Sequence, residues 1–227
     1  MMHESKKCLV ILGMHRSGSS TLAGCLHFLG VDFGFNLLSG NGTGHSSTWA
    51  NQDVTLIHDL LYRDLGCRWD MVGSLPQDWV SSQAADLAKG KIASLIDREL
   101  SSSRLWGVTD PRLCRMLPLW QGIFKEKGID PCFLFLIRHP LEVALSLRER
   151  VGFDLLKGHL LWLVHTREAL LSCQGQPYTI LTYDQLLADP VSTLKSIEQQ
   201  FDLNFPRPLG EHLQQIIGFV RPDLKHQ

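Results

Sequence analysis

The chain has 227 residues, of which 44% are hydrophobic and 20% are charged, and its formal net charge at pH 7 is −1. That length suits one large α/β domain or two small ones, and it is enough to bury a substantial core. A net charge so close to zero excludes a global field that attracts DNA or an acidic membrane. We therefore expect no nucleic-acid or membrane partner, and any anion site has to be local.

The cysteines and the N-terminal residues indicate the cellular compartment in which the protein is expected. Six cysteines are dispersed along the chain without a Cys-x-x-Cys pair, and several lie inside apolar runs. This pattern predicts buried free thiols in a reducing environment rather than disulfides or a metal site. The first apolar run, Cys8–Leu12, is too short to span a bilayer, and no small-residue cleavage site follows it. No other run reaches spanning length, so the sequence predicts a cytoplasmic protein.

Apolar runs bounded by polar or glycine-rich turns alternate with segments of helical spacing. In chain order, the pattern predicts a strand at Cys8–Leu12, helices at Thr21–Leu29, Asp53–Leu65 and Gln83–Leu100, strands at Leu105–Val108 and Cys132–Ile137, helices at Leu141–Arg150 and Asp154–Cys173, a strand at Tyr178–Leu181 and a helix at Val191–Phe201. This alternation favours an α/β fold with a mainly parallel sheet flanked by helices. We expect one domain over residues 1–227, with flexible ends at 1–7 and 222–227.

The most informative segment is Gly13–Thr21, with the sequence GMHRSGSST, between the first strand and the first helix. Gly13 and Gly18 have the G-x-x-x-x-G spacing of a phosphate loop, in which backbone N–H groups and the helix N-terminus face one anion. Ser19 replaces the Lys that follows the second glycine in a Walker A motif, and the cation of the loop is Arg16. The loop is therefore suited to bind an anion but lacks the usual equipment for ATP or GTP hydrolysis.

A second cation follows the strand predicted at Cys132–Ile137. Arg138 lies where this strand leaves the sheet, which is the edge at which open α/β sheets bind ligands. Ser146 lies eight residues further on, about two helical turns, and can face the same site. Alone, Arg138 is equally well explained as a surface ion-pair residue. Combined with the loop, it predicts the second half of a two-phosphate clamp.

Together these segments resemble the sulfotransferases of the P-loop superfamily that use 3′-phosphoadenosine 5′-phosphosulfate (PAPS). Arg16–Ser20 is similar to the Lys-Ser-Gly-Thr-Thr loop that holds the 5′-phosphosulfate in that family, and Arg138 and Ser146 match the pair that holds the 3′-phosphate. Trp106–Arg112 and Thr182–Pro190 also look like segments of bacterial members. The resemblance implies a single sulfotransferase-like domain with PAP as product and no metal. It implies that the donor is held by Arg16, Ser17, Gly18, Ser19, Ser20, Thr21, Arg138 and Ser146.

The resemblance also implies a division of tasks during transfer. An acceptor hydroxyl attacks the sulfur while negative charge grows on the oxygen that leaves with PAP, and positioning and charge stabilisation supply most of the catalysis. Arg16 would stabilise that charge, and Arg148 or Arg150 could approach the 3′-phosphate. The glycine-rich segment Gly34–Trp49 is long enough to be a functional loop, and we expect it to meet a small-molecule or carbohydrate acceptor.

The base that activates the acceptor has several candidates. Asp110 is the first, although an Asp-Pro turn capped through its own backbone explains this residue equally well. The others are Asp53, His45 and His58. Arg112 could clamp the sulfuryl group or the acceptor, or pair with a carboxylate. The chain also departs from similar bacterial proteins at two polar positions, with Ala50 in place of an acidic residue and Thr109 in place of Lys.

These departures leave two further functions open beside a PAPS-dependent sulfotransferase. One is a catalytically degenerate protein that binds PAPS or PAP without turnover, which the residues at positions 50 and 109 favour. The other is a nucleotide-dependent kinase, which the missing Lys after Gly18 disfavours. The sequence does not name the acceptor, because its specificity would lie in the segment Gly34–Trp49 and the helices near it.

Overall fold

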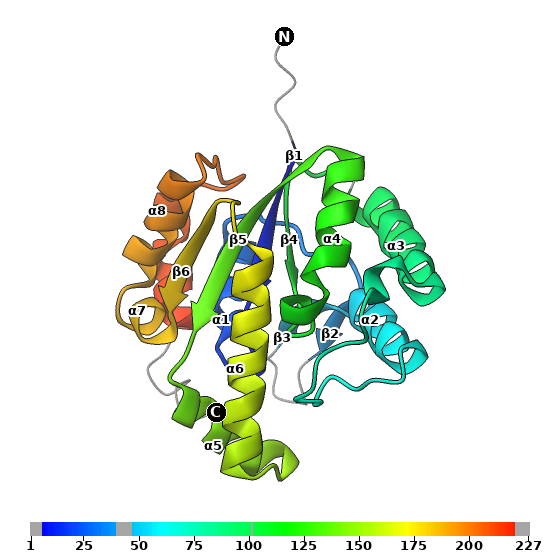
Figure 1. The fold of residues 1–227 in the computed structure, drawn as a ribbon. Helices are drawn as coiled ribbons and strands as arrows, with labels where there is room; N and C mark the ends of the chain where they lie inside the picture. Colours follow the sequence, from blue (N-terminus) through cyan, green and yellow to red (C-terminus); the bar gives the residue numbers. More distant parts are fainter. Residues whose placement is uncertain (1–5, 40–46, 101, 221–227) are drawn as a thin grey trace.

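The computed structural model describes residues 6–39, 47–100 and 102–220 (Figure 1). Within these residues the main sheet has four parallel strands in the order β4-β1-β5-β6. Their bounds are β1 Lys6–Leu12, β4 Leu105–Thr109, β5 Ile129–Ile137 and β6 Tyr178–Thr182. These are the four strands predicted from the sequence, and the mainly parallel α/β fold is confirmed. Because all four are parallel, their carboxyl ends meet at one edge, toward the bottom of Figure 1.

Helices cover both faces of this sheet. In the described ranges they are α1 Ser19–Phe28, α2 Gln52–Asp64, α3 Gln83–Leu95, α4 Leu113–Lys127, α5 Pro140–Val151, α6 Leu155–Ser172, α7 Tyr183–Ala188, α8 Pro190–Gln200 and α9 Leu209–Phe219. A 3₁₀ turn, Trp79–Ser81, precedes α3, and a π-helical segment, Ile96–Leu100, follows it. The helix predicted at Gln83–Leu100 is therefore an α-helix that widens in its last turn.

The core lies on both sides of the sheet, because successive side chains of a strand point to opposite faces. From β1, Cys8, Val10 and Leu12 enter the cluster under α2, α3, α4 and α6, while Leu9 and Ile11 enter the cluster under α1, α7 and α8. Figure 1 shows α4 and α6 in front of the sheet and α1 behind it. A parallel sheet covered on both faces explains why its strands read as continuous apolar runs.

The first strand starts earlier than its apolar residues indicate. Lys6 and Lys7, expected in a flexible end, already pair with β5 as part of β1. Lys7 Nζ donates to the carbonyl oxygens of Phe201 and Asp202 at 2.8 Å, which ties the strand to the turn after α8. The remaining residues of the two expected flexible ends, 1–5 and 222–227, lie outside the described residues.

The glycine-rich segment expected as a loop, Gly34–Trp49, is partly a hairpin. Two short strands, β2 Leu37–Ser39 and β3 Ser47–Asn51, pair antiparallel, and residues 40–46 between them lie outside the described ranges. β3 packs against α1 and β4 and leads directly into α2. The side chain of Asn51 accepts hydrogen bonds from the first N–H groups of α2, so the hairpin also fixes where that helix begins.

The cysteines are free thiols, as predicted. Burial raises the pKa of the Cys25 and Cys114 thiols to about 12, which keeps them protonated and unreactive. Among the described helices, none is both long and apolar enough to cross a membrane.

Candidate functional site

The loop between β1 and α1 is a tight turn at the carboxyl edge of the sheet. A Cβ on Gly13 would lie 2.8 Å from the Leu136 carbonyl oxygen of β5. Gly18 has φ 91°, and a Cβ there would lie 2.2 Å from the Tyr183 ring, so both its conformation and its contact require glycine. Arg16 also has a positive φ, 73°, which is uncommon for a residue with a side chain. Each of the two glycines predicted to shape the loop thus has a physical reason to be glycine.

The start of α1 holds backbone donors that have no partner among the described residues. Thr21 and Leu22 donate their N–H groups to the Gly18 carbonyl oxygen at 2.9 and 3.2 Å. Within the described residues, the N–H groups of Gly18, Ser19 and Ser20 make no hydrogen bond. The helix macrodipole adds partial positive charge at the same end. The loop therefore offers an anion three neighbouring donors.

Two of the residues predicted to hold the sulfuryl donor, Ser17 and Thr21, also stabilise the loop itself. The Ser17 N–H donates to the Met14 carbonyl oxygen at 3.1 Å and closes the turn. The Thr21 side chain hydrogen-bonds to Tyr183, which joins α1 to the start of α7. Burial raises the pKa of Tyr183, so its hydroxyl stays neutral beside the loop. These contacts keep the loop in shape before any ligand binds.

The second predicted anchor meets the phosphate loop directly. Arg138 follows β5, and its Nη1 donates to the Arg16 carbonyl oxygen at 3.1 Å. Arg16 Nε in turn donates to Ser146 Oγ at 2.8 Å, across a separation of 130 residues in sequence. Arg138 also pairs with Glu142 at 2.9 Å and lies 5.1 Å from the centroid of the Tyr183 ring. Residues predicted from separate segments are thus brought together.

Positive charge is concentrated at this point and is only partly compensated. Burial lowers the pKa of Arg16, and the charges of Arg150 and Arg138 lower it further. Glu142 pairs with Arg138 and the charge of Glu149 acts to raise the pKa of Arg16, but within the described residues no carboxylate forms an ion pair with Arg16. Partly buried cations without a counter-charge favour an anionic ligand. Of the two arginines considered for the 3′-phosphate, Arg150 is the one whose charge acts on Arg16.

Asp110 lies just after β4 and is almost fully buried. Thr55 Oγ1 donates to its Oδ2 at 2.9 Å, and the Arg112 N–H donates to its Oδ1 at 2.8 Å. The Arg112 guanidinium lies 3.2 and 3.3 Å from the two oxygens. His58 Nδ1 lies 3.5 Å from Oδ2, and Nε2 of the same ring accepts from Trp120 Nε1 at 2.9 Å. Asp110 therefore ends a buried chain of polar contacts.

This environment makes Asp110 a poor proton acceptor. Burial by itself raises the pKa of Asp110, but the polar contact with His58 and the charge of Arg112 outweigh burial and hold the pKa well below its ordinary value. A general base works best when its pKa lies near the operating pH. The contacts of Asp110 therefore favour the structural alternative, in which this residue caps the Asp-Pro turn by accepting the Arg112 N–H, over the role of base.

Arg112 is balanced by two carboxylates. Its Nε and Nη2 donate to Asp59 at 2.7 and 3.1 Å, while Nη1 faces Asp110. These ion pairs correspond to the second of the two roles considered for Arg112, pairing with a carboxylate. The two positions where the chain departs from similar bacterial proteins, Ala50 in β3 and Thr109 in β4, are both buried.

The other predicted bases are bonded elsewhere or not described. Asp53 accepts a hydrogen bond from Asn36 and pairs with Arg98 at 3.2 Å. His58 is fully buried between Asp110 and Trp120. His45 lies outside the described residues.

His15, inside the phosphate loop, is not among the site residues that the sequence predicts. Its ring packs against Trp69 with centroids 4.5 Å apart, and its Nε2 is buried. Within the described residues the imidazole makes no hydrogen bond. Burial lowers the pKa of His15 to about 4, Asp110 acts to raise it, and nearby arginines lower it. The sequence signal that could have found this residue is its place inside the loop, directly before Arg16.

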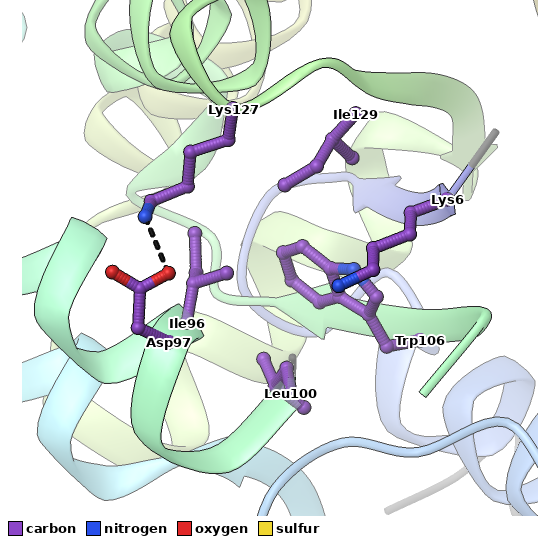
Figure 2. A pocket seen from close by; sticks show the side chains of 7 residues that line it. All are labelled: Lys6, Ile96, Asp97, Leu100, Trp106, Lys127 and Ile129. Carbon is purple, nitrogen blue, oxygen red and sulfur yellow. Dashed lines mark hydrogen bonds and ion pairs between the residues drawn. The ribbon is translucent and has the colours of Figure 1, made fainter. Parts of the chain in front are cut away.

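Two cavities lie away from these residues. Figure 2 shows one at the amino-terminal edge of the sheet, of about 280 Å³, where Lys127 pairs with Asp97 beside Trp106. A wider groove of about 740 Å³ lies between α2 and α3. Neither is lined by the phosphate loop, Asp110 or Arg138. The candidate site is therefore a set of converging donors and cations at the carboxyl edge rather than either cavity.

Comparison with solved structures identifies this fold in known proteins. The sulfotransferase domain from the olefin synthase of Synechococcus PCC 7002 is 16% identical and aligns over 100% of this chain and 85% of its own, with a TM-score of 0.56. The sulfotransferase domain from the curacin biosynthetic pathway is also 16% identical, over 88% of this chain and 75% of its own, with a TM-score of 0.48. No protein-family model and no curated protein matches the chain. The chain thus has a bacterial sulfotransferase-like fold, as the sequence resemblance predicted.

Proposed function

We propose that the protein binds PAPS and transfers its sulfuryl group to a hydroxyl of a small-molecule or carbohydrate acceptor. The observation that carries the proposal is the junction of the two predicted anchors, in which Arg138 donates to Arg16 and Arg16 donates to Ser146. PAPS has anionic groups at both its 5′ and its 3′ position, and two linked sets of charged donors suit two such groups. The fold is similar to that of a sulfotransferase domain, which supports the proposal as far as the fold is concerned.

In the proposed complex the 5′-phosphosulfate lies against the N–H groups of Gly18, Ser19 and Ser20, which have no other partner in the described residues. The 3′-phosphate lies against Arg138 and Ser146. The Ser146 hydroxyl is able to donate to the phosphate because its oxygen already accepts from Arg16. No residue has to change its protonation state for the donor to bind.

Arg16 supplies the charge stabilisation in this scheme. As the acceptor oxygen bonds to sulfur, the bond from sulfur to the bridging oxygen breaks, and its electron pair leaves with PAP. A guanidinium beside that oxygen stabilises the growing negative charge, and it stays charged because Arg does not readily give up a proton. The bond from Arg16 Nε to Ser146 orients the guanidinium, and the bond from Arg138 to the Arg16 carbonyl oxygen holds the backbone of the loop, before the reaction.

A melting experiment tests the donor. PAP at a hundred times its Kd adds about 2.7 kcal/mol to the free energy of unfolding, which corresponds to a rise in Tm of roughly 5–10 °C for a chain of this size. We expect this rise without added metal, with ADP and AMP giving smaller shifts because they lack the 3′-phosphate. A larger shift with ATP and Mg²⁺ than with PAP would favour the kinase alternative and contradict the proposal.

A PAPS or PAP binder without turnover is the second candidate. It is favoured by the buried Ala50 and Thr109, and by the contacts that disfavour Asp110 as a base. Single-turnover reactions with ³⁵S-labelled PAPS and a panel of hydroxyl acceptors separate the two functions. Tight PAP binding with no labelled product in any reaction would favour the binder.

A further inference from the structure

The proposed transfer needs a group that takes the proton from the acceptor hydroxyl. Four carboxylates near the phosphate loop pair with a cation: Asp110 and Asp59 with Arg112, Glu142 with Arg138, and Asp70 with Lys157. The exposed Glu149 also acts on Arg16 through its charge. An ion pair stabilises the charged form of a carboxylate and makes it a weaker base. The pKa values of Asp110 and Asp70 lie below the ordinary value, despite burial, because of their polar and charged partners, so these two groups are poorly suited to accept a proton near neutral pH.

Among the imidazoles near the loop, His15 is the one without a hydrogen bond in the described residues. The Nε2 of His58 accepts from Trp120, and that ring is fully buried. His139 caps α5 by accepting from the Leu141 N–H at 3.3 Å. His15 precedes Arg16 directly, in the loop that the proposed donor contacts, and its ring is fixed by Trp69 rather than by a polar partner.

From this arrangement we infer that His15 is the general base of the transfer, an inference that rests on the proposed function. As the acceptor oxygen forms its bond to sulfur, its O–H bond breaks and the proton passes to a ring nitrogen of His15. The electron pair of the O–H bond stays on the acceptor oxygen, and the electron pair of the breaking sulfur–oxygen bond leaves with PAP. Donor, acceptor and His15 account for every atom and charge of the step.

The charged groups around His15 make the pKa of its ring depend on whether PAPS is bound. The charged and titratable groups that act on the ring are Asp110, Arg112, Arg16, Arg150 and His165. Burial is the largest cause of the lowered pKa, which is about 4 without ligand, and the three arginines lower it further. A bound PAPS anion offsets the charge of Arg16 and Arg150, so the pKa of His15 rises when the donor binds. The ring is neutral in the free protein and becomes a stronger base in the complex.

A rate comparison tests the inference directly. His15→Gln keeps a polar side chain of similar length but removes the base, so we expect kcat in single-turnover transfer to fall by ~10²-fold or more. PAP affinity should stay within about threefold of wild type, because only the transition state needs the base. His212→Gln, at a half-buried histidine of α9, is the matched control and should keep the wild-type rate. Added imidazole should restore part of the rate of His15→Ala, a rescue that a purely structural role does not predict.

Two titrations give independent readouts. In wild type the rate should fall as the pH drops through the pKa of His15 in the donor complex, because a base acts only when unprotonated, and His15→Gln should lose this limb. NMR of ring-labelled histidine should show the pKa of His15 rising by roughly one unit or more when PAP is added.

The possible outcomes separate the two proposals. If wild type binds PAP and transfers the sulfuryl group, but folded His15→Gln retains its rate and its pH profile, the base is another group and the proposed function stands. An unchanged His15 pKa in the PAP complex would also overturn the inference. If wild type does not bind PAP, the proposed function and the inference fall together.

Discussion

Two clusters of charged residues lie at the carboxyl edge of the sheet, and they differ in what balances the charge of their arginines. Arg112, after β4, is held by Asp110 and Asp59. Arg16, in the phosphate loop, bonds the neutral Ser146 and lies near two further arginines. The fold neutralises the first cluster by itself and compensates the second only in part, since Glu142 pairs with Arg138 but not with Arg16. Residues of the same type therefore serve structure in one place and, in the function that we propose, ligand binding in the other.

The two clusters should also differ in how they contribute to the free energy of unfolding. A buried ion pair contributes to a unique structure and is costly to break, because the remaining charge has no partner. Like charges held together weaken the compact state until a counter-charge arrives. Substitutions in the two clusters should therefore have opposite signatures, with loss of stability at Asp110 and loss of binding or turnover at Arg16 and Arg138.

The largest expected effect is on stability at Asp110. Asp110→Ala leaves Arg112 without its buried partner and removes the acceptor of Thr55, so the free energy of unfolding should fall by about 3–5 kcal/mol. Asp59→Ala removes the more exposed partner of the same arginine and should cost only about 1 kcal/mol or less. Urea unfolding of both variants measures the difference. Equal losses would show that the Asp110 pair is not the one that holds this cluster.

The next effect is on turnover at Arg16. Arg16→Ala removes the cation beside the leaving oxygen, so kcat should fall by ~10²-fold, comparable to the loss of an oxyanion donor. PAP affinity should fall less, because the contact strengthens in the transition state. Arg16→Lys should recover part of the rate, since it keeps the charge but not the reach to Ser146. Single-turnover transfer measures kcat and PAP titration measures affinity, so the two effects can be separated. An unchanged rate in Arg16→Ala would show that Arg16 does not take part in the transfer.

Arg138 should affect binding more than rate. Loss of one charge-assisted contact to the 3′-phosphate weakens binding by about 1.5–3 kcal/mol, which is roughly 10- to 150-fold in Kd. The loss should appear for PAP and be absent for AMP, which has no 3′-phosphate. Calorimetric titration of Arg138→Ala with both nucleotides measures it. If both ligands lose affinity equally, the effect comes from the bond between Arg138 and the Arg16 carbonyl oxygen rather than from the 3′-phosphate.

Local sequence patterns predict much of the fold and both anchors, the phosphate loop and Arg138. Buried parallel strands read as apolar runs, and their carboxyl ends necessarily share one edge, so the sequence alone predicts that Gly13–Thr21 and Arg138 lie near one another. The helix α4 is not predicted, because Pro118 lies in its interior and proline usually ends a helix. The short α7 is also missed, although Thr182 and Gln185 form a capping box that signals its start.

The hydrogen-bond partners and protonation of a side chain are harder to predict from sequence than its position in the fold. The sequence correctly indicates Asp110 at the end of a strand, but its partners Thr55 and His58 come from α2, more than 50 residues earlier. No spacing rule links those segments, since β4 and α2 meet only through tertiary packing. The sequence does mark the position of His15, directly before Arg16, but the surroundings of its ring escape prediction for the same reason. Its lack of a polar partner is visible only once Trp69 is seen against it.

The smallest expected effect is the one that bears most directly on the comparison of the two clusters. In the absence of ligand, Arg16→Ala loses the hydrogen bond to Ser146 but also relieves the repulsion from Arg138 and Arg150. The two changes oppose each other, so the free energy of unfolding should change by no more than about 1 kcal/mol. PAP should then stabilise wild type more than the variant, because part of its stabilisation comes from the charge that Arg16 carries.

Urea unfolding with and without PAP, at low salt so that screening is weak, measures all four states. Arg112→Ala is the matched control. It removes an arginine from the same edge of the sheet but leaves Asp110 as a buried charge without its partner, so it should destabilise the ligand-free protein by several kcal/mol. If Arg16→Ala destabilises the ligand-free protein as much as Arg112→Ala does, Arg16 is part of the structural framework. The contrast between a neutralised and a partly compensated cluster would then be wrong.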